Sequence, residues 1–489
     1  MPPEGANGTA ELPQPWQSVG SKGLNNLASK LLIILFPPES PFFRFAVSDF
    51  TLSKLTAKAE GAGEGAHDVR AEFEEALGKV ERAVTQRLEE RGSRMQLFET
   101  CKHLILGGNG LLQVLPDEKL KLHKLDRFVV KRDQQGNVTE LVVRETVSKT
   151  TLPDEIRTIV ETSPSSEKTG DKAEDSVDIY TWVQRVGKKW TVMQEANGVT
   201  LPGAGTYPID KSPWIPVRLI SVDGEDYGRG FVEEVEGDLS SYDSLRQSLV
   251  EGAAISARMI PLVDEAGVTD IKQVNGARNG QAIPGKKKDI EFLQVEKAAD
   301  LRVAHEVATD IKRDLQQAFL LLAGSTRDAE RVTAEEIRMI AQELETSSLS
   351  GAYSVLSQEF QYPLVSRVLA QMTRRNELPS LPEKSVSLQI VTGNAGLGRS
   401  SDFQKIRLLV ADIGAVFGPP AVAEYVSVGS YLKRAATALA IDVDGMVRSE
   451  EEVQRERQRV SQMEIAKASI GPAAKLAGQQ MEQPAAPTQ

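Results

Sequence analysis

A glycine pattern in the last quarter of the chain is the closest match in this sequence to a catalytic motif. The stretch TGNAGLGRS, residues 392–400, places Gly393 and Gly398 at the spacing of a phosphate-binding loop, between the strand-like VSLQIV and a predicted helix from Asp402. Arg399 stands where such a loop needs a lysine, and a guanidinium is bulkier than the ammonium group that reaches the β- and γ-phosphates. No acidic strand end for magnesium is apparent downstream. The pattern favours a structural turn, with a degenerate nucleotide-binding site as the alternative.

A basic turn could bind an anion or an acidic partner. The sequence GKKK at residues 285–288 ends in Lys286, Lys287 and Lys288. Three adjacent ammonium groups suit docking of an acidic protein or a phosphate, and they suit a solvated loop equally well. Both interpretations stay open at this point.

Two arginines lie among acids after the apolar run AFLLLAG. Arg327 and Arg331 flank Asp328 and Glu330 in a short polar segment that has too little apolar surface to pack. Its charges are therefore predicted to be exposed. Local electrostatics at a helix end is the alternative explanation for these charges.

Side chains that commonly hold metals or transfer protons are few and scattered. None of the four histidines stands at ligand spacing from another, and the motifs HExxH, CxxC and GxSxG are absent. The fragment IDVDG, residues 441–445, lacks the third acid and the closing glutamate of a calcium loop. The single cysteine, Cys101, excludes an internal disulfide and a thiolate cluster. We expect no metal site and no cofactor.

Long helices must position the charged groups. Apolar residues recur at helical spacing in residues 231–259 and 298–323, which predicts a helical hairpin, with residues 260–297 as a small subdomain at its tip. Thr333 and Glu336 form a capping box that predicts the start of the next helix. That helix is predicted to run to about Arg375 with a kink at Pro363.

The remainder of the chain predicts a mainly helical α+β protein. Helices are expected within residues 15–38 and 67–90, and alternating apolar residues from 111 to 217 predict two β-hairpins with turns near Gly136 and Gly187. The residues after about 395 are predicted to be helical, and the tail 471–489 is too poor in large apolar side chains to pack.

Composition limits the classes of function. With a net charge of −11, the protein is not a simple basic DNA-binding protein. The longest apolar run, LLIILF, is far shorter than the roughly 20 residues of a membrane span, so we expect no membrane partner.

Three stretches carry a resemblance to a known family. PWQSVGSKGLNNLASKLLIILFPP, DGEDYGRGFVEEVEGDL and ERVTAEEIRMIAQELE together resemble the portal, or head-to-tail connector, proteins of short-tailed bacteriophages, in an order and spacing that span about Pro15 to Ile441. The resemblance implies a ring, typically of twelve subunits, at one capsid vertex, with a central channel through which double-stranded DNA is packaged and ejected. It implies a structural protein and no enzyme.

The resemblance also implies a division of the chain into parts. These are a wing (1–228), two stem helices (229–259 and 298–324) with a clip between them (260–297), a tunnel loop (325–332), a long kinked helix returning to the wing (333–394), a crown (395–470) and a disordered tail (471–489).

Partners and roles follow from the same resemblance. The clip, with Lys286, Lys287 and Lys288, would meet the terminase large subunit and afterwards the tail adaptor proteins; capsid, scaffolding and internal core proteins are further partners, in the virion and in the host cytoplasm during assembly. The tunnel loop would present Arg327 and Arg331 to passing phosphates without base specificity, and Asp328 and Glu330 would weaken the grip. A helical scaffold that uses the lysines but has no DNA channel is a further alternative.

Overall fold

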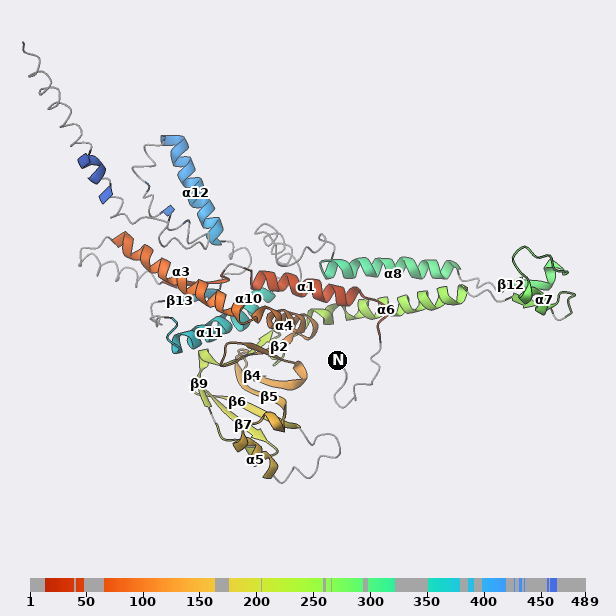
Figure 1. The fold of residues 1–489 in the computed structure, drawn as a ribbon, viewed down its shortest axis with the longest axis horizontal. Helices are drawn as coiled ribbons and strands as arrows, with labels where there is room; N and C mark the ends of the chain where they lie inside the picture. The colour runs from red at the N-terminus through yellow and green to blue at the C-terminus, as the bar shows by residue number, and fades with distance from the viewer. Residues whose placement is uncertain are drawn as a thin grey trace, which may run out of the picture. The chain divides into compact units, whose positions relative to one another are not determined.

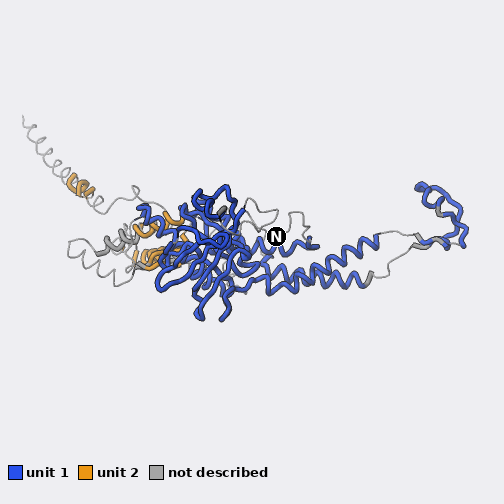
Figure 2. Tube along the Cα trace, turned by 90° about the horizontal axis from the view of Figure 1, so that it is seen from below, with its two compact units in different colours: residues 1–38, 87–379 blue, residues 39–86, 380–489 orange. Residues whose placement is uncertain are grey.

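The computed structural model describes most of the first 418 residues. The described ranges are 14–38, 41–47, 66–162, 176–203, 205–257, 261–264, 266–292, 298–321, 351–378, 386–390 and 398–418, with isolated positions after residue 425. The chain divides into two compact units, residues 1–38 with 87–379 and residues 39–86 with 380–489 (Figure 2). Among the described residues, no helix is long and apolar enough to cross a bilayer.

Helices α1 (Val19–Leu35) and α4 (Ser93–Gly107) pack together in the first unit. Leu27, Leu31 and Leu35 recur every fourth residue in α1 and are all buried, so one face of the helix lies in the core. The helix ends at Leu35, and Phe36 is followed directly by two prolines that cannot continue a helix. The predicted first helix is confirmed.

The first unit contains two larger antiparallel sheets. One has the order β10 (Trp214–Arg218), β2 (Asn109–Val114), β3 (Leu120–His123). The other has six strands: β4 (Phe128–Arg132), β5 (Val138–Ser148), β6 (Ser176–Val186), β7 (Lys189–Ala196), β8 (Val199–Thr200) and β9 (Gly205–Pro208). Gly136 and Gly187 take positive φ at the β4–β5 and β6–β7 turns, so both predicted hairpins are confirmed.

A short helix between the hairpins, α5 (Asp154–Thr162), was not predicted from the sequence. Its Val160 is fully buried with Val177, Ile179 and Ala196 of the sheet. Ile156, Ile159 and Val160 stand at helical spacing, and the apolar face that they form packs on this patch of the sheet.

The predicted hairpin of long helices is present. Helices α6 (Phe231–Ser256) and α8 (Ala298–Ala318) run side by side in the first unit (Figure 1). Helix α8 ends before the predicted position, Gly324. Leu320 takes φ +53°, and the amides of Leu320 and Leu321 donate to the carbonyls of Gln317 and Gln316, which is a Schellman motif. A leucine in this left-handed position gives no stop signal in the sequence.

The segment between these two helices forms the predicted tip subdomain. Strands β11 (Pro261–Val263) and β12 (Ile290–Phe292) pair antiparallel, and α7 (Ile271–Gly276) and the 3-10 turn η5 (Lys287–Asp289) complete it.

The helix over residues 352–374 contains a π-turn, a widened helical turn, just before Pro363. Helix α10 (Ala352–Leu356) continues into a π-turn, η7 (Ser357–Gln361), and then into α11 (Tyr362–Arg374). The amide of Tyr362 donates to the carbonyl of Ser357, five residues back. Pro363 lies directly after this turn and has no amide hydrogen to donate, so the predicted kink takes the form of a local π-turn.

The second unit contains helix α3 (Ala66–Glu90) up to residue 86 and a two-stranded sheet. Strand β1 (Phe43–Val47) pairs antiparallel with β13 (Val386–Ile390), and the amide of Phe45 donates to the buried carboxylate of Glu81 at 2.8 Å. Helix α12 (Gly398–Phe417) follows β13 in the chain.

Candidate functional site

The predicted docking lysines lie exposed on the tip subdomain, and a buried acid holds the backbone beneath them. Asp289 accepts hydrogen bonds from the amide of Val268 at 3.0 Å and the hydroxyl of Thr269 at 2.8 Å. The Thr269 hydroxyl in turn accepts the amide of Lys286 at 3.1 Å. The hydrogen bond from Thr269 is the main cause that lowers the pKa of Asp289, so the acid remains ionised and the turn stays closed.

An exposed apolar residue is bonded to the same buried acid. Val268 is 76% exposed, and its own amide is bonded to Asp289, next in the chain to Lys288. Exposed apolar residues rimmed by charge are typical of protein interfaces. The tip therefore presents a preformed patch, which we call the tip patch: Val268, Lys286, Lys287 and Lys288.

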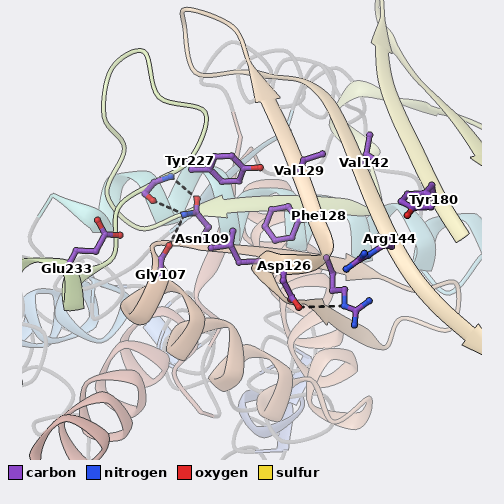
Figure 3. Close-up of a pocket in the computed structure, with 13 residues that line it drawn as sticks. Gly107, Asn109, Asp126, Phe128, Val129, Val142, Arg144, Tyr180, Tyr227 and Glu233 are labelled. Carbon is purple, nitrogen blue, oxygen red and sulfur yellow. Dashed lines mark hydrogen bonds and ion pairs between the residues drawn. The ribbon is translucent and has the colours of Figure 1, made fainter. Parts of the chain in front are cut away.

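The start of α6 is locked to the sheets through glycine backbone. Asn109 accepts the amide of Gly228 at 2.7 Å and donates to its carbonyl at 2.7 Å, as the strand of a sheet would (Figure 3). A side chain on Gly108 would lie 2.3 Å from the backbone of Arg229, so only glycine allows this approach. Glu233 accepts the amide of Gly230 at 2.9 Å and caps the helix.

A buried charge cluster joins the six-stranded sheet to the π-turn. Arg132 has a side chain only 4% exposed and donates to the carbonyls of Gly136, Pro216 and Asp226. Its remaining partner is Glu359, which also accepts Arg218 Nη2 at 2.5 Å. Burial lowers the pKa of Arg132 and the Glu359 charge opposes that shift. The carboxylate thus compensates two buried guanidinium groups.

The free edge of β4 is closed by side chains of the same loop that starts α6. The amide of Val130 donates to the Tyr227 hydroxyl at 3.3 Å, and the amide of Arg132 donates to Asp226 at 2.6 Å. Satisfied edge groups cannot recruit another strand. This loop, DGEDYGRG, is one of the stretches that carry the family resemblance, and its residues build the joint between sheet and stem.

The C-terminal end of α8 is held by α1. Asn26 donates to the carbonyls of Phe319 and Leu320 at 3.1 and 3.0 Å, and the buried Lys30 donates to that of Leu320 at 2.9 Å. The Phe319 ring is fully buried against Gly23, where an added Cβ would lie 2.4 Å from the ring. Both ends of the helical hairpin are therefore fixed to the same unit.

An open depression of about 560 Å³ lies beside the joint (Figure 3). Phe128, Val129 and Tyr227 give it an apolar lining, and Asp126 pairs with Arg127 at 3.7 Å at its rim. No group of three or more His, Cys, Asp or Glu in the described part of the chain could hold a metal ion. The depression has the chemistry of a packing surface.

The other predicted site residues fall outside the described part. Arg327, Asp328, Glu330 and Arg331, and the predicted cap formed by Thr333 and Glu336, all lie within residues 322–350, which the structure does not describe. They remain predictions.

The glycine motif is described only at its end. Residues 393–397 lie outside the described part, and Gly398 already begins α12, four residues before the predicted start. The preceding strand β13 pairs antiparallel with β1 in a two-stranded sheet, whereas a phosphate loop follows a strand of a βαβ unit. The described geometry does not favour a nucleotide site.

The sequence did not reveal the residues of the Arg132–Glu359 cluster or those of α1 that hold the end of α8. Arg132 and Glu359 are 227 positions apart, and no local pattern announces their contact. Asn26 and Lys30 did leave a signal, because two polar residues at i,i+4 spacing interrupt the apolar face of α1.

Comparison with known proteins gives consistent matches over most of the chain. The family model described as "Bacteriophage head to tail connecting protein" matches residues 3–447. The portal protein of Enterobacteria phage T3 is 37% identical over 462 residues, covering 93% of this chain and 83% of that protein. The portal protein of Escherichia phage T7 is 37% identical over 464 residues, covering 93% and 84%. That of Pseudomonas phage phiKMV is 30% identical over 482 residues, covering 96% and 90%.

Similarity to solved structures is weaker. A chain from the virion of a native gene transfer agent particle aligns over 87% of this chain and 90% of its own length, with 13% identity and a TM-score of 0.38. At that level the alignment adds nothing to the description of the fold.

Proposed function

This chain belongs to the bacteriophage head-to-tail connecting proteins, and on that premise we propose that it assembles into a ring of twelve subunits at one capsid vertex. The ring is a structural, non-catalytic conduit for double-stranded DNA during packaging and ejection. It resides in the virion and passes through the host cytoplasm during assembly.

The observation that carries the proposal is the hairpin of α6 and α8, which is fixed at its base where α6 starts and where α8 ends. Helix α6 carries six acidic residues and one arginine, Arg246. A wall rich in lysine and arginine would release many counterions and hold DNA tightly, whereas an acidic wall lets it slide. The charge of the stem supports passage rather than capture.

We place the DNA contact in the tunnel loop, residues 325–332. Arg327 and Arg331 attract phosphates, and Asp328 and Glu330 keep that attraction weak and independent of sequence. The capping pair Thr333 and Glu336 fixes the start of the helix that follows the loop.

The double change Arg327→Ala with Arg331→Ala tests this placement. It is expected to leave ring assembly intact and to reduce packaging or retention of DNA, because the positive charges facing the phosphates are lost. Arg185→Ala, at an exposed arginine of β6, is the matched control. A normal yield of filled, stable particles from the double variant would show that these arginines have no channel role.

We assign the tip patch to docking of the terminase large subunit and, later, the tail adaptor proteins, through an acidic surface of each partner. Major capsid, scaffolding and internal core proteins contact other parts of the ring. Complementary charge mainly raises the association rate and is screened by salt. Val268 supplies the apolar centre and the three lysines supply the rim.

The chain offers a close control for the tip patch. The turn at Gly187 carries Lys188 and Lys189, both exposed, in the same GKK sequence as residues 285–287. Lys287→Ser with Lys288→Ser is expected to slow association with purified terminase about tenfold at low salt, and Lys188→Ser with Lys189→Ser to leave it unchanged. Equal association rates for the two double variants would remove the assignment.

A further inference from the structure

Helix α1 contacts the chain on both sides of residues 322–350. Its Asn26 and Lys30 donate three hydrogen bonds to the carbonyls of Phe319 and Leu320, where α8 ends. Its carboxyl end receives the returning chain: the Leu35 carbonyl accepts Gln361 Nε2. The ring of Phe36, directly after α1, meets that of Phe360 edge to face at 5.2 Å.

Several features of the α8 anchor are costly on their own. Leu320 has a left-handed backbone, which costs a side-chain-bearing residue roughly 1–2 kcal/mol. Lys30 is a lysine only 7% exposed, and the Phe319 ring has room only because residue 23 is glycine. Such features persist where the surrounding contacts over-determine the geometry. The end of α8 is thus held in a set position rather than frayed.

The second anchor is held equally firmly. Three consecutive residues of the π-turn contact three different elements: Glu359 bonds to Arg132 and Arg218, Phe360 is fully buried against Phe36, and Gln361 is fully buried. A regular α-helix spaces successive side chains by about 100°, and the widened turn changes that spacing. The π-turn is therefore held on the sheets through Glu359 and on α1 through Phe360 and Gln361.

We propose that α1 is a positioning strut for residues 322–350. Asn26 and Lys30 set the point where this segment leaves the stem, and Leu35 and Phe36 set the point to which it returns. Asn26 and Leu35 are nine residues apart, which is about 14 Å along the helix axis. The end of α8 and the π-turn η7, the described anchors on either side of the segment, are therefore both held by α1. The effect of this strut on DNA rests on the proposed channel function; the anchoring does not.

An isosteric pair of variants tests the first anchor. Asn26→Asp replaces a double donor by a carboxylate that faces two carbonyls, whereas Asn25→Asp makes the same charge change on the exposed side of α1. In assembled full-length protein, amide exchange in the last turn of α8 is expected to rise about tenfold in Asn26→Asp and to stay at the wild-type rate in Asn25→Asp. Amides of β5 and β6 are expected to keep their rates in both, which separates local release from general destabilisation. Equal exchange of the α8 end in the two variants would overturn the proposal.

If Asn26→Asp does not fold, variants of Lys30 test the same anchor. Lys30→Met removes the donor but keeps the stem, Lys30→Arg keeps a donor, and Lys22→Met is the exposed control on the same helix. Fast exchange at the end of α8 in Lys30→Met, with rescue in Lys30→Arg, supports the strut. Fast exchange in both, or in neither, shows that the hydrogen bond does not position this end.

Measuring DNA retention in the same variant distinguishes failure of the anchoring proposal from failure of the proposed DNA contact. Loss of retention in Asn26→Asp particles together with faster exchange supports both proposals. Faster exchange with wild-type retention keeps the strut and counts against a DNA contact in the tunnel loop.

Discussion

Arg132 and Glu359 show how much of this molecule depends on single buried residues. Arg132 uses its guanidinium to bond three carbonyls and one carboxylate, and its side chain is 4% exposed. Glu359→Gln removes the charge that compensates Arg132 and Arg218, so it is expected to lower the free energy of unfolding by about 3 kcal/mol in urea titrations. Glu155→Gln, exposed on α5, is expected to change it by less than about 0.5 kcal/mol. Equal decreases in the unfolding free energy of Glu359→Gln and Glu155→Gln would mean that the Glu359 charge is not needed to compensate the two arginines.

The burial of His123 predicts how the stability of the folded protein depends on pH. Burial lowers its pKa to about 4, against the opposing effect of Glu145, whose carboxylate lies 4.0 Å away and also pairs with Lys121. His123 Nε2 lies 2.9 Å from the Gln113 amide oxygen. Between pH 6.5 and about 4 the unfolded chain binds this proton and the folded chain does not, so stability falls as pH falls through that window.

The variant His123→Gln isolates that contribution. Its unfolding free energy is expected to fall less steeply than that of the wild type between pH 6.5 and 4. Parallel pH profiles for wild type and His123→Gln would show that this histidine does not titrate with folding.

At the scale of the elements, two helical glycines differ in whether the packing around them leaves room for a side chain. In α1, a Cβ on Gly23 would lie 2.4 Å from Phe319; in α6, one on Gly237 would meet nothing within 4 Å. Gly23→Ala is expected to lower stability by about 1–3 kcal/mol because the ring must move, and Gly237→Ala to raise it by up to about 1 kcal/mol. Thermal unfolding of both variants checks the opposite signs, and a shift in the same direction would contradict the packing described for α1.

The sequence predicted the elements that local chemistry determines. Turn glycines 136 and 187 gave the hairpins, and helical periodicity gave α1, α6 and most of α8. It could not give the end of α8, because Leu320 adopts its left-handed backbone only where Asn26 and Lys30 bind the carbonyls. Nor could it give the π-turn contacts, which join residues far apart in the chain, as between Glu359 and Arg132. The predicted docking lysines are exposed on a rigid turn, and the tunnel-loop residues remain predictions from sequence.

At the scale of the whole molecule, the family assignment and the acidic stem converge on a conduit. A ring requires that each subunit use two different surfaces and that the rotation between neighbours close. The contacts of Asn109, Arg132 and Asn26 tie α6, α8 and the sheets of one subunit together, which suits closure at a fixed angle.

Imaging of the purified protein by electron microscopy tests the central claim most directly. We expect uniform rings with a central hole wide enough for duplex DNA, with twelve subunits in averaged end views. A uniform small monomer at high concentration would contradict it.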